Sequence, residues 1–126
     1  MTDAAINPLE TAVLQEICKQ LHPQDRAALE EQMKGITFQS RENTGAGFFA
    51  RFAIEKKTTQ QIHNDTKGYY VTAKINGLED AMGFILWTKV GYVDCLEGYT
   101  MALKSTAGMD FATIEFESTA PPAISD

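Results

Sequence analysis

The sequence predicts an α+β domain in which an N-terminal helix, or a pair of helices, packs on one face of a five- to six-stranded, mainly antiparallel meander sheet. Three observations predict this fold. Apolar residues recur with a helical period near the N-terminus, and the pattern changes to strand-like alternation after Gly35. The predicted strands then follow one another on short connections, without segments long enough to be crossover helices, which favours antiparallel pairing.

The first helix is predicted from its capping residues. Asn7 is a suitable N-cap, Pro8 fits the first helical position, and Glu10 completes a capping-box spacing. A second short helix is expected over residues 23–33 and should end at Gly35. One apolar stripe of the first helix should face the core, and its members are Leu9, Val13, Leu14, Ile17, Cys18 and Leu21.

Alternating and apolar runs predict six strands. They cover residues 36–41, 48–55, 69–75, 82–88, 92–100 and 111–116. We expect one domain over residues 1–117 and a flexible tail over 118–126, because the consecutive prolines there cannot donate to a sheet ladder. The glycines of segment 42–47 are interpreted as turn and bulge positions rather than as a phosphate-binding loop.

Composition narrows the class of protein. The chain has 126 residues, 44% of them hydrophobic, and a formal net charge of −6, which argues against nucleic-acid binding. Cys18 and Cys95 lack a CxxC spacing, so we expect free buried thiols and a reducing compartment. The first residues do not resemble a signal peptide and no stretch reaches membrane-spanning length. We therefore expect a cytoplasmic protein that does not bind membranes.

The most informative segment is the predicted hairpin over residues 82–100. A two-residue turn would force Val90 to a positive φ, which a β-branched side chain resists, so we expect a three-residue loop at 89–91. That register places Glu97 opposite Gly83. Because side chains alternate along a strand, Glu97 should share its face with a largely apolar set: Ile85, Trp87, Val93, Cys95 and Tyr99.

A carboxylate on such a face has two interpretations. As a site, Glu97 could transfer a proton or hold a cationic or hydrogen-bonding partner. As a structural residue, it could turn toward water at a bulge near Gly98, protect a sheet edge, or pair with a Lys or Arg. The candidate binding residues around it are Glu97, Tyr99, Trp87, Gly83 and Arg51, and no residue is assigned a catalytic role.

Four short segments resemble a group of small uncharacterised bacterial proteins. They are residues 45–48 (Gly-Ala-Gly-Phe), 77–79 (Gly-Leu-Glu), 83–84 (Gly-Phe) and 96–100 (Leu-Glu-Gly-Tyr-Thr). The resemblance covers about the middle half of the chain and ends after Thr100. It implies a bacterial origin and an antiparallel sheet, and it implies no activity.

Two functional classes remain open. The first is a non-enzymatic binding module that recognises a basic protein partner or a small ligand with its sheet face. The second is a small enzyme in which Glu97 is the general acid or base, assisted by Tyr99, Arg51 or Asp94. The fourth strand is apolar on both faces, so a homodimer is also expected. We expect no cofactor and no metal site, because the two histidines, His22 and His63, lie far apart without neighbouring ligands.

Overall fold

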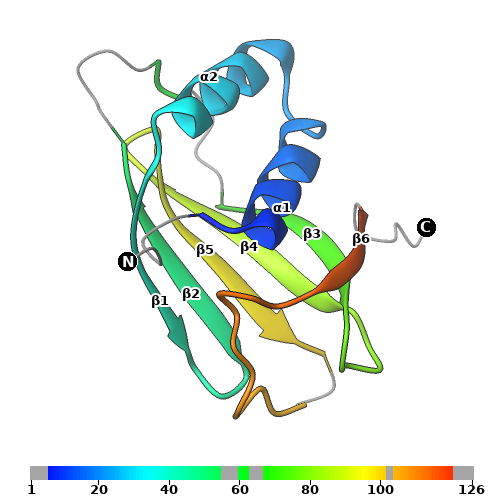
Figure 1. Ribbon diagram of the computed structural model, residues 1–126. Helices are drawn as coiled ribbons and strands as arrows, with labels where there is room; N and C mark the ends of the chain where they lie inside the picture. Colours follow the sequence, from blue (N-terminus) through cyan, green and yellow to red (C-terminus); the bar gives the residue numbers. More distant parts are fainter. Residues whose placement is uncertain (1–5, 55–59, 63–66, 102–103, 121–126) are drawn as a thin grey trace.

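The computed structural model describes residues 6–54, 60–62, 67–101 and 104–120, with the side chains of 67–70 excepted. These residues form two helices followed by six strands, which confirms the predicted α+β fold. The elements are α1 (Pro8–Cys18), α2 (Pro23–Lys34), β1 (Thr37–Asn43), β2 (Gly47–Ala53), β3 (Lys67–Ile75), β4 (Met82–Lys89), β5 (Tyr92–Thr100) and β6 (Phe116–Ala120). Both helices lie on the same face of the sheet (Figure 1).

The sheet is antiparallel throughout, as predicted, but its strand order is not consecutive. The order is β1-β2-β5-β4-β3-β6. Strands β3, β4 and β5 form a meander, whereas β2 pairs with β5 and β6 pairs with β3. As a result β5 and β4 lie at the centre, so the candidate hairpin occupies the middle of the sheet.

Helix α1 begins where the sequence predicts. The Asn7 side chain accepts a hydrogen bond from the Glu10 backbone N–H at 2.8 Å, and the Glu10 carboxylate accepts one from the Asn7 backbone N–H at 3.0 Å. This capping box satisfies two N–H groups that the first turn leaves without helical partners. Helix α2 has Pro23 at its start and Gly35 at its C-cap, also as predicted.

The core lies between the helices and the inner face of the sheet. The predicted stripe of α1 is buried along its whole length, from Leu9 to Cys18, and Leu21 follows it. Opposite the stripe are the inward residues of the strands, which are Phe48, Ala50, Phe52, Val71, Ala73, Ile75, Met82, Phe84, Leu86 and Leu96. Gly98 belongs to this inner face. A Cβ on Gly98 would lie 2.7 Å from a carbon of the Phe48 ring and 2.9 Å from one of Phe84.

The prediction for the sixth strand is wrong in position. Residues 111–115 form turns and irregular structure, and β6 begins only at Phe116. Asp110 causes the difference, because its carboxylate accepts a hydrogen bond from the Ala112 N–H at 3.0 Å and its carbonyl accepts one from the Thr113 N–H. The turn directs Phe111 into the core, where its ring stacks on Phe48 at 4.6 Å.

The predicted tail begins too early. β6 continues to Ala120 and pairs with β3, so residues 118–120 belong to the sheet. The interpretation of residues 121–126 as a flexible tail lies outside the described residues.

Helix α2 is fixed to the central hairpin by one buried amide. The Gln32 side chain donates to the Gln60 and Gly91 carbonyls at 2.8 and 2.9 Å, and it accepts from the Val93 N–H at 2.9 Å. Both the amide nitrogen and the amide oxygen of Gln32 therefore have hydrogen-bond partners inside the core. Gln32 therefore determines where the β4–β5 turn sits relative to the helices.

Candidate binding site

The candidate site lies on the outer face of the sheet, away from α1 and α2. Among the described residues, neither helix nor any loop packs over the centre of this face (Figure 1). Ile85, Trp87, Cys95, Glu97 and Tyr99 all point outward, which confirms that these five residues share one face.

The predicted hairpin register is wrong. The turn has two residues, with Val90 at φ +53° and Gly91 at φ +82°, and Lys89 pairs with Tyr92. The strain at Val90 is compatible with the fold because the turn is held from outside the hairpin. The Ile62 N–H and the Gln32 side chain both donate to the Gly91 carbonyl, and the Gln61 side chain donates to the Val90 carbonyl.

This register changes what lies beside Glu97. Glu97 pairs with Ile85 on one side and with Phe49 on the other, and not with Gly83. A register shift between Trp87 and Thr88 places an extra residue in β5, so Val93 faces the core with 3% of its surface exposed. Val93 is therefore not a member of the outer face, contrary to the prediction.

Gly83 lies opposite Tyr99, and the Tyr99 ring covers it. A Cβ on Gly83 would lie 2.4 Å from the ring carbon that carries the hydroxyl. The space predicted beside Glu97 is therefore absent at Gly83, because the tyrosine ring fills it. Tyr99 lies two residues beyond Glu97 in β5, and neither Tyr99 nor Gly83 lines the hollow beside Glu97.

The open space lies on the other side of Glu97. A shallow hollow of about 470 Å³ contains three of the five predicted site residues, Glu97, Trp87 and Arg51. The Trp87 indole N–H donates to the Glu97 carboxylate at 3.0 Å. Trp87 is 40% exposed, one of only two large apolar side chains with high exposure among the described residues. The other residues that line the hollow are Phe49, Thr88, Lys89, Asp94 and Cys95.

Charge in the hollow is mixed. Arg51 and Lys89 supply two cations, and Glu97 and Asp94 supply two carboxylates. The guanidinium of Arg51 lies 6.0 Å from the centre of the Phe49 ring, and none of the ion pairs between described residues includes Arg51 or Glu97. Register places Arg51 beside Cys95, so Arg51 and Glu97 are diagonal neighbours on adjacent strands. Among the described side chains, the Glu97 carboxylate thus has no ion-pair partner.

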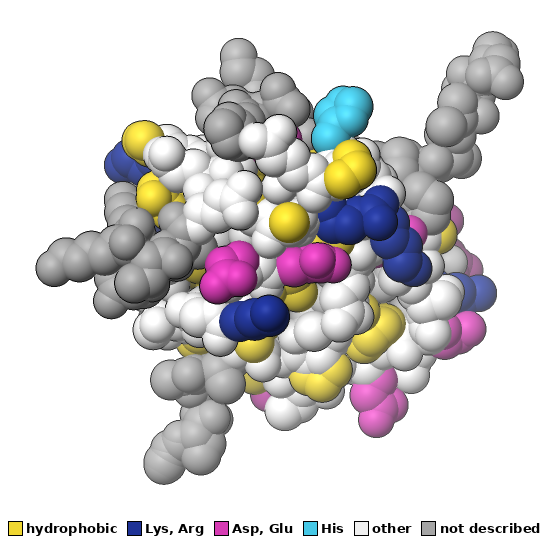
Figure 2. Space-filling view, turned by 90° about the horizontal axis from the view of Figure 1, so that it is seen from above, with side chains coloured by type: hydrophobic (Ala, Val, Ile, Leu, Met, Phe, Trp, Pro, Cys, Tyr) yellow, Lys and Arg dark blue, Asp and Glu magenta, His cyan; other side chains and the backbone are white. Residues whose placement is uncertain are grey.

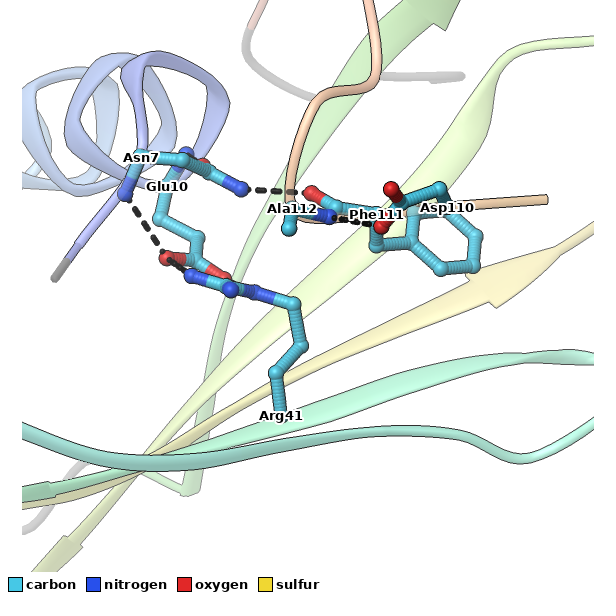
Figure 3. A network of polar contacts seen from close by, with 6 residues as sticks. All are labelled: Asn7, Glu10, Arg41, Asp110, Phe111 and Ala112. Atoms are coloured by element: carbon cyan, nitrogen blue, oxygen red, sulfur yellow. Dashed lines mark hydrogen bonds and ion pairs between the residues drawn. The ribbon is translucent and has the colours of Figure 1, made fainter. Parts of the chain in front are cut away.

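Sequence reasoning missed a second polar centre on the helix side, shown in Figure 3. Arg41 in β1 binds the Glu10 carboxylate through two contacts of 2.6 and 2.7 Å. Glu10 is fully buried, and the Asn7 side chain donates to the Phe111 carbonyl at 2.6 Å. This network ties α1 to β1 and to the segment before β6. The capping-box spacing predicted Glu10 only as a helix cap, and nothing local in the sequence indicates its partner.

Another hollow lies between the two helices. It has a volume of about 510 Å³, and its lining includes Cys18, Lys19, Arg26 and Met33. Figure 2 views the molecule from this end and shows Lys and Arg side chains gathered beside a histidine. Arg26 already donates to the Cys18 and Lys19 carbonyls at 2.9 and 3.0 Å, which caps the end of α1. We therefore interpret this hollow as part of the helix packing.

The two cysteines carry poorly reactive thiols. Cys18 and Cys95 are free and buried, and burial raises the pKa of each thiol to about 11. Thiols with such pKa values are protonated at neutral pH and react slowly. His22 is exposed at the start of α2 and its side chain caps nothing there. His63 lies outside the described residues.

Within the described ranges, no three His, Cys, Asp or Glu side chains gather closely enough to hold a metal ion. Neither of the two described helices is long and apolar enough to cross a membrane. In the comparisons with known proteins, the chain matches no protein family, no curated protein and no solved structure.

Proposed function

We propose that the protein is a non-enzymatic binding module that recognises a basic protein partner on its outer sheet face, with Glu97 receiving a Lys or Arg side chain. The observation that carries this proposal is the Trp87–Glu97 pair. One oxygen of the carboxylate is fixed by the indole N–H at 3.0 Å, and the pair opens into a hollow on an otherwise uncovered face.

One part of the hollow, around Trp87 and Glu97, favours a cation. Trp87 and Phe49 provide aromatic rings on the same face as the carboxylate. Aromatic faces attract ammonium and guanidinium groups, and a carboxylate beside them adds a charge-assisted hydrogen bond. Exposed Trp, Tyr and Arg side chains are also the residue types that contribute most to protein interfaces. The hollow therefore suits the end of a Lys or Arg side chain.

The charge of the whole chain favours the same class of partner. A net charge of −6 on 126 residues attracts basic surfaces over distances longer than direct contacts reach. This long-range attraction raises the rate of encounter, whereas the hollow provides the specific contact. Both contributions should weaken as salt concentration rises.

The enzyme alternative has less support. A general acid or base transfers its proton to or from the substrate and is usually tuned for this by burial or by a charged neighbour. The hydrogen-bond partner of Glu97 is the neutral indole N–H of Trp87, which carries no charge that would tune the carboxylate. The buried thiol in the hollow, Cys95, has its pKa raised to about 11 and is a poor nucleophile at neutral pH.

The sole tryptophan makes the proposal directly testable. Because Trp87 is the one tryptophan of the chain, its fluorescence reports on the hollow alone. A peptide of alternating lysine and alanine, titrated at low protein concentration and low salt, should change the emission to saturation. The Glu97→Gln variant should bind this peptide at least about tenfold more weakly, since a charge-assisted contact is lost.

Glu31→Gln is the matched control. Glu31 is exposed on α2, so this variant has the same net charge as Glu97→Gln but an intact sheet face. It should bind the peptide about as well as the wild-type protein. Equal weakening in both variants would mean that only overall charge matters, and the proposed site would be wrong. A matched peptide of glutamate and alanine should leave the emission unchanged.

A further inference from the structure

We infer that the outer face also binds a second copy of the chain, with Arg51 of each protomer entering the Trp87–Glu97 hollow of the other. This inference rests on the proposed function, because it requires the hollow to accept a cationic side chain. In such a dimer, Arg51 of the second protomer would compete with a basic partner for the hollow. A basic partner would then have to displace one protomer from the other.

Arg51 has the properties of such a competitor. It is exposed, it lies on the outer face of β2, and it is one strand away from Glu97. Within one chain these two residues are diagonal neighbours and form no ion pair. The guanidinium rests 6.0 Å from the Phe49 ring at the border of the hollow, directed to the same side of the sheet.

A two-fold axis would give both Arg51 and Glu97 a partner of opposite charge in the other protomer. In a symmetric dimer, any contact between Arg51 of one protomer and Glu97 of the other occurs twice. The hollow also has equal numbers of cations and carboxylates, Arg51 and Lys89 against Asp94 and Glu97. Although the chain is acidic overall, the hollow is therefore locally neutral, and a second copy can approach it without strong local repulsion.

The size of the face fits a weak dimer. Neighbouring strands lie about 4.8 Å apart and rise about 3.3 Å per residue. Four inner strands of about seven residues therefore cover about 19 by 23 Å, or roughly 440 Å², if the face is treated as flat. A standard stable interface buries about 800 Å² on each partner. The footprint is about half of that area, so we expect weak association, with dissociation in the micromolar range or above, where a basic partner can compete.

The sheet edge at β1 is a poorer docking surface than this face. β1 contains a register shift between Phe38 and Ser40, and its Arg41 turns inward to bind Glu10. Bulges and inward-pointing charges on an edge strand oppose the addition of another strand. A second copy should therefore meet the face of the sheet and leave this edge unpaired.

Sedimentation equilibrium with charge-reversed variants tests the inference. The wild-type chain, of 13.9 kDa, should show a monomer–dimer equilibrium at micromolar to tens-of-micromolar concentration. Arg51→Glu and Glu97→Arg should each be monomeric, with the dissociation constant raised about tenfold or more, because each homodimer would place like charges together. An equal mixture of the two variants should recover the dimer, since both cross-interface contacts become opposite charges again.

Two further variants control for folding and for overall charge. Lys34→Glu and Glu31→Arg make the same changes of charge on the exposed surface of α2 and should leave the wild-type dimer intact. Circular dichroism melts verify that every variant is folded.

A wild-type chain that stays monomeric across this range would overturn the inference, as would single variants that dimerise as well as the wild type. Neither result would affect the peptide titration, which compares Glu97→Gln with Glu31→Gln on dilute, monomeric protein. A failure of the proposed function would appear there, as equal peptide binding by those two variants.

Discussion

Breaking the ion pair between Arg41 and Glu10 should strongly destabilise the contact between α1 and the sheet. Replacing Arg41 with Met keeps an unbranched apolar stem and removes the guanidinium group with its charge. The Glu10 carboxylate, which has no exposed surface, would lose two contacts of 2.6 and 2.7 Å and keep the hydrogen bond from the Asn7 N–H. A buried charge that loses its partner costs about 3–5 kcal/mol. Two lost charge-assisted hydrogen bonds, at about 1.5–3 kcal/mol each, give a similar sum.

Urea denaturation followed by circular dichroism measures this loss. With a slope of about 1–3 kcal/mol per molar urea, the midpoint should fall by about 2 M. Such a loss is a large part of the 5–15 kcal/mol that holds a typical domain together. Arg51→Met is the matched control, because it makes the same chemical change at an exposed site and should cost less than about 1 kcal/mol.

A double variant separates the interaction energy of the ion pair from the effect of each side chain on its other neighbours. Glu10→Gln combined with Arg41→Met leaves no buried charge, so its loss should be smaller than the sum of the two single losses. The reasoning would be refuted if Arg41→Met were no more destabilising than Arg51→Met, or if the two single losses at Arg41 and Glu10 simply added.

Two other changes test the packing and the thiols. Gly98→Ala should destabilise the fold by about 1–3 kcal/mol in urea melts, because its Cβ would lie 2.7 and 2.9 Å from the rings of Phe48 and Phe84; an unchanged midpoint would show that this layer can relax. Burial raises the pKa of the Cys18 and Cys95 thiols from 9.0 to about 11, so between these values the folded chain holds more protons than the unfolded chain and stability falls as pH rises. Urea melts at pH 8 and pH 10 should therefore show a larger fall for the wild type than for a variant with alanine at both cysteines, and equal falls would contradict the burial of the thiols.

Local patterns predicted most of the fold because their physical causes are local. The start of α1 follows from Asn7, Pro8 and Glu10, which satisfy the N–H groups of the helix within one turn. The outward set from Ile85 to Tyr99 follows from strand alternation, which survives any shift of the hairpin by an even number of residues. Alternation also placed Arg51 on the side of β2 opposite Phe48, Ala50 and Phe52, but only the pairing of β2 with β5 brings that side onto the face of Glu97.

The sequence by itself therefore determined the order of helices and strands, the buried stripe of α1 and the outward direction of Ile85, Trp87, Cys95, Glu97 and Tyr99. The tertiary structure decided the hairpin register, since the strain at Val90 is offset by hydrogen bonds to the turn from Gln32 and from segment 60–62. It also decided that Tyr99 covers Gly83 and that Arg41 meets Glu10. Each of these contacts joins residues that are distant in the chain. A local sequence pattern does not specify which distant residue will contact a given side chain.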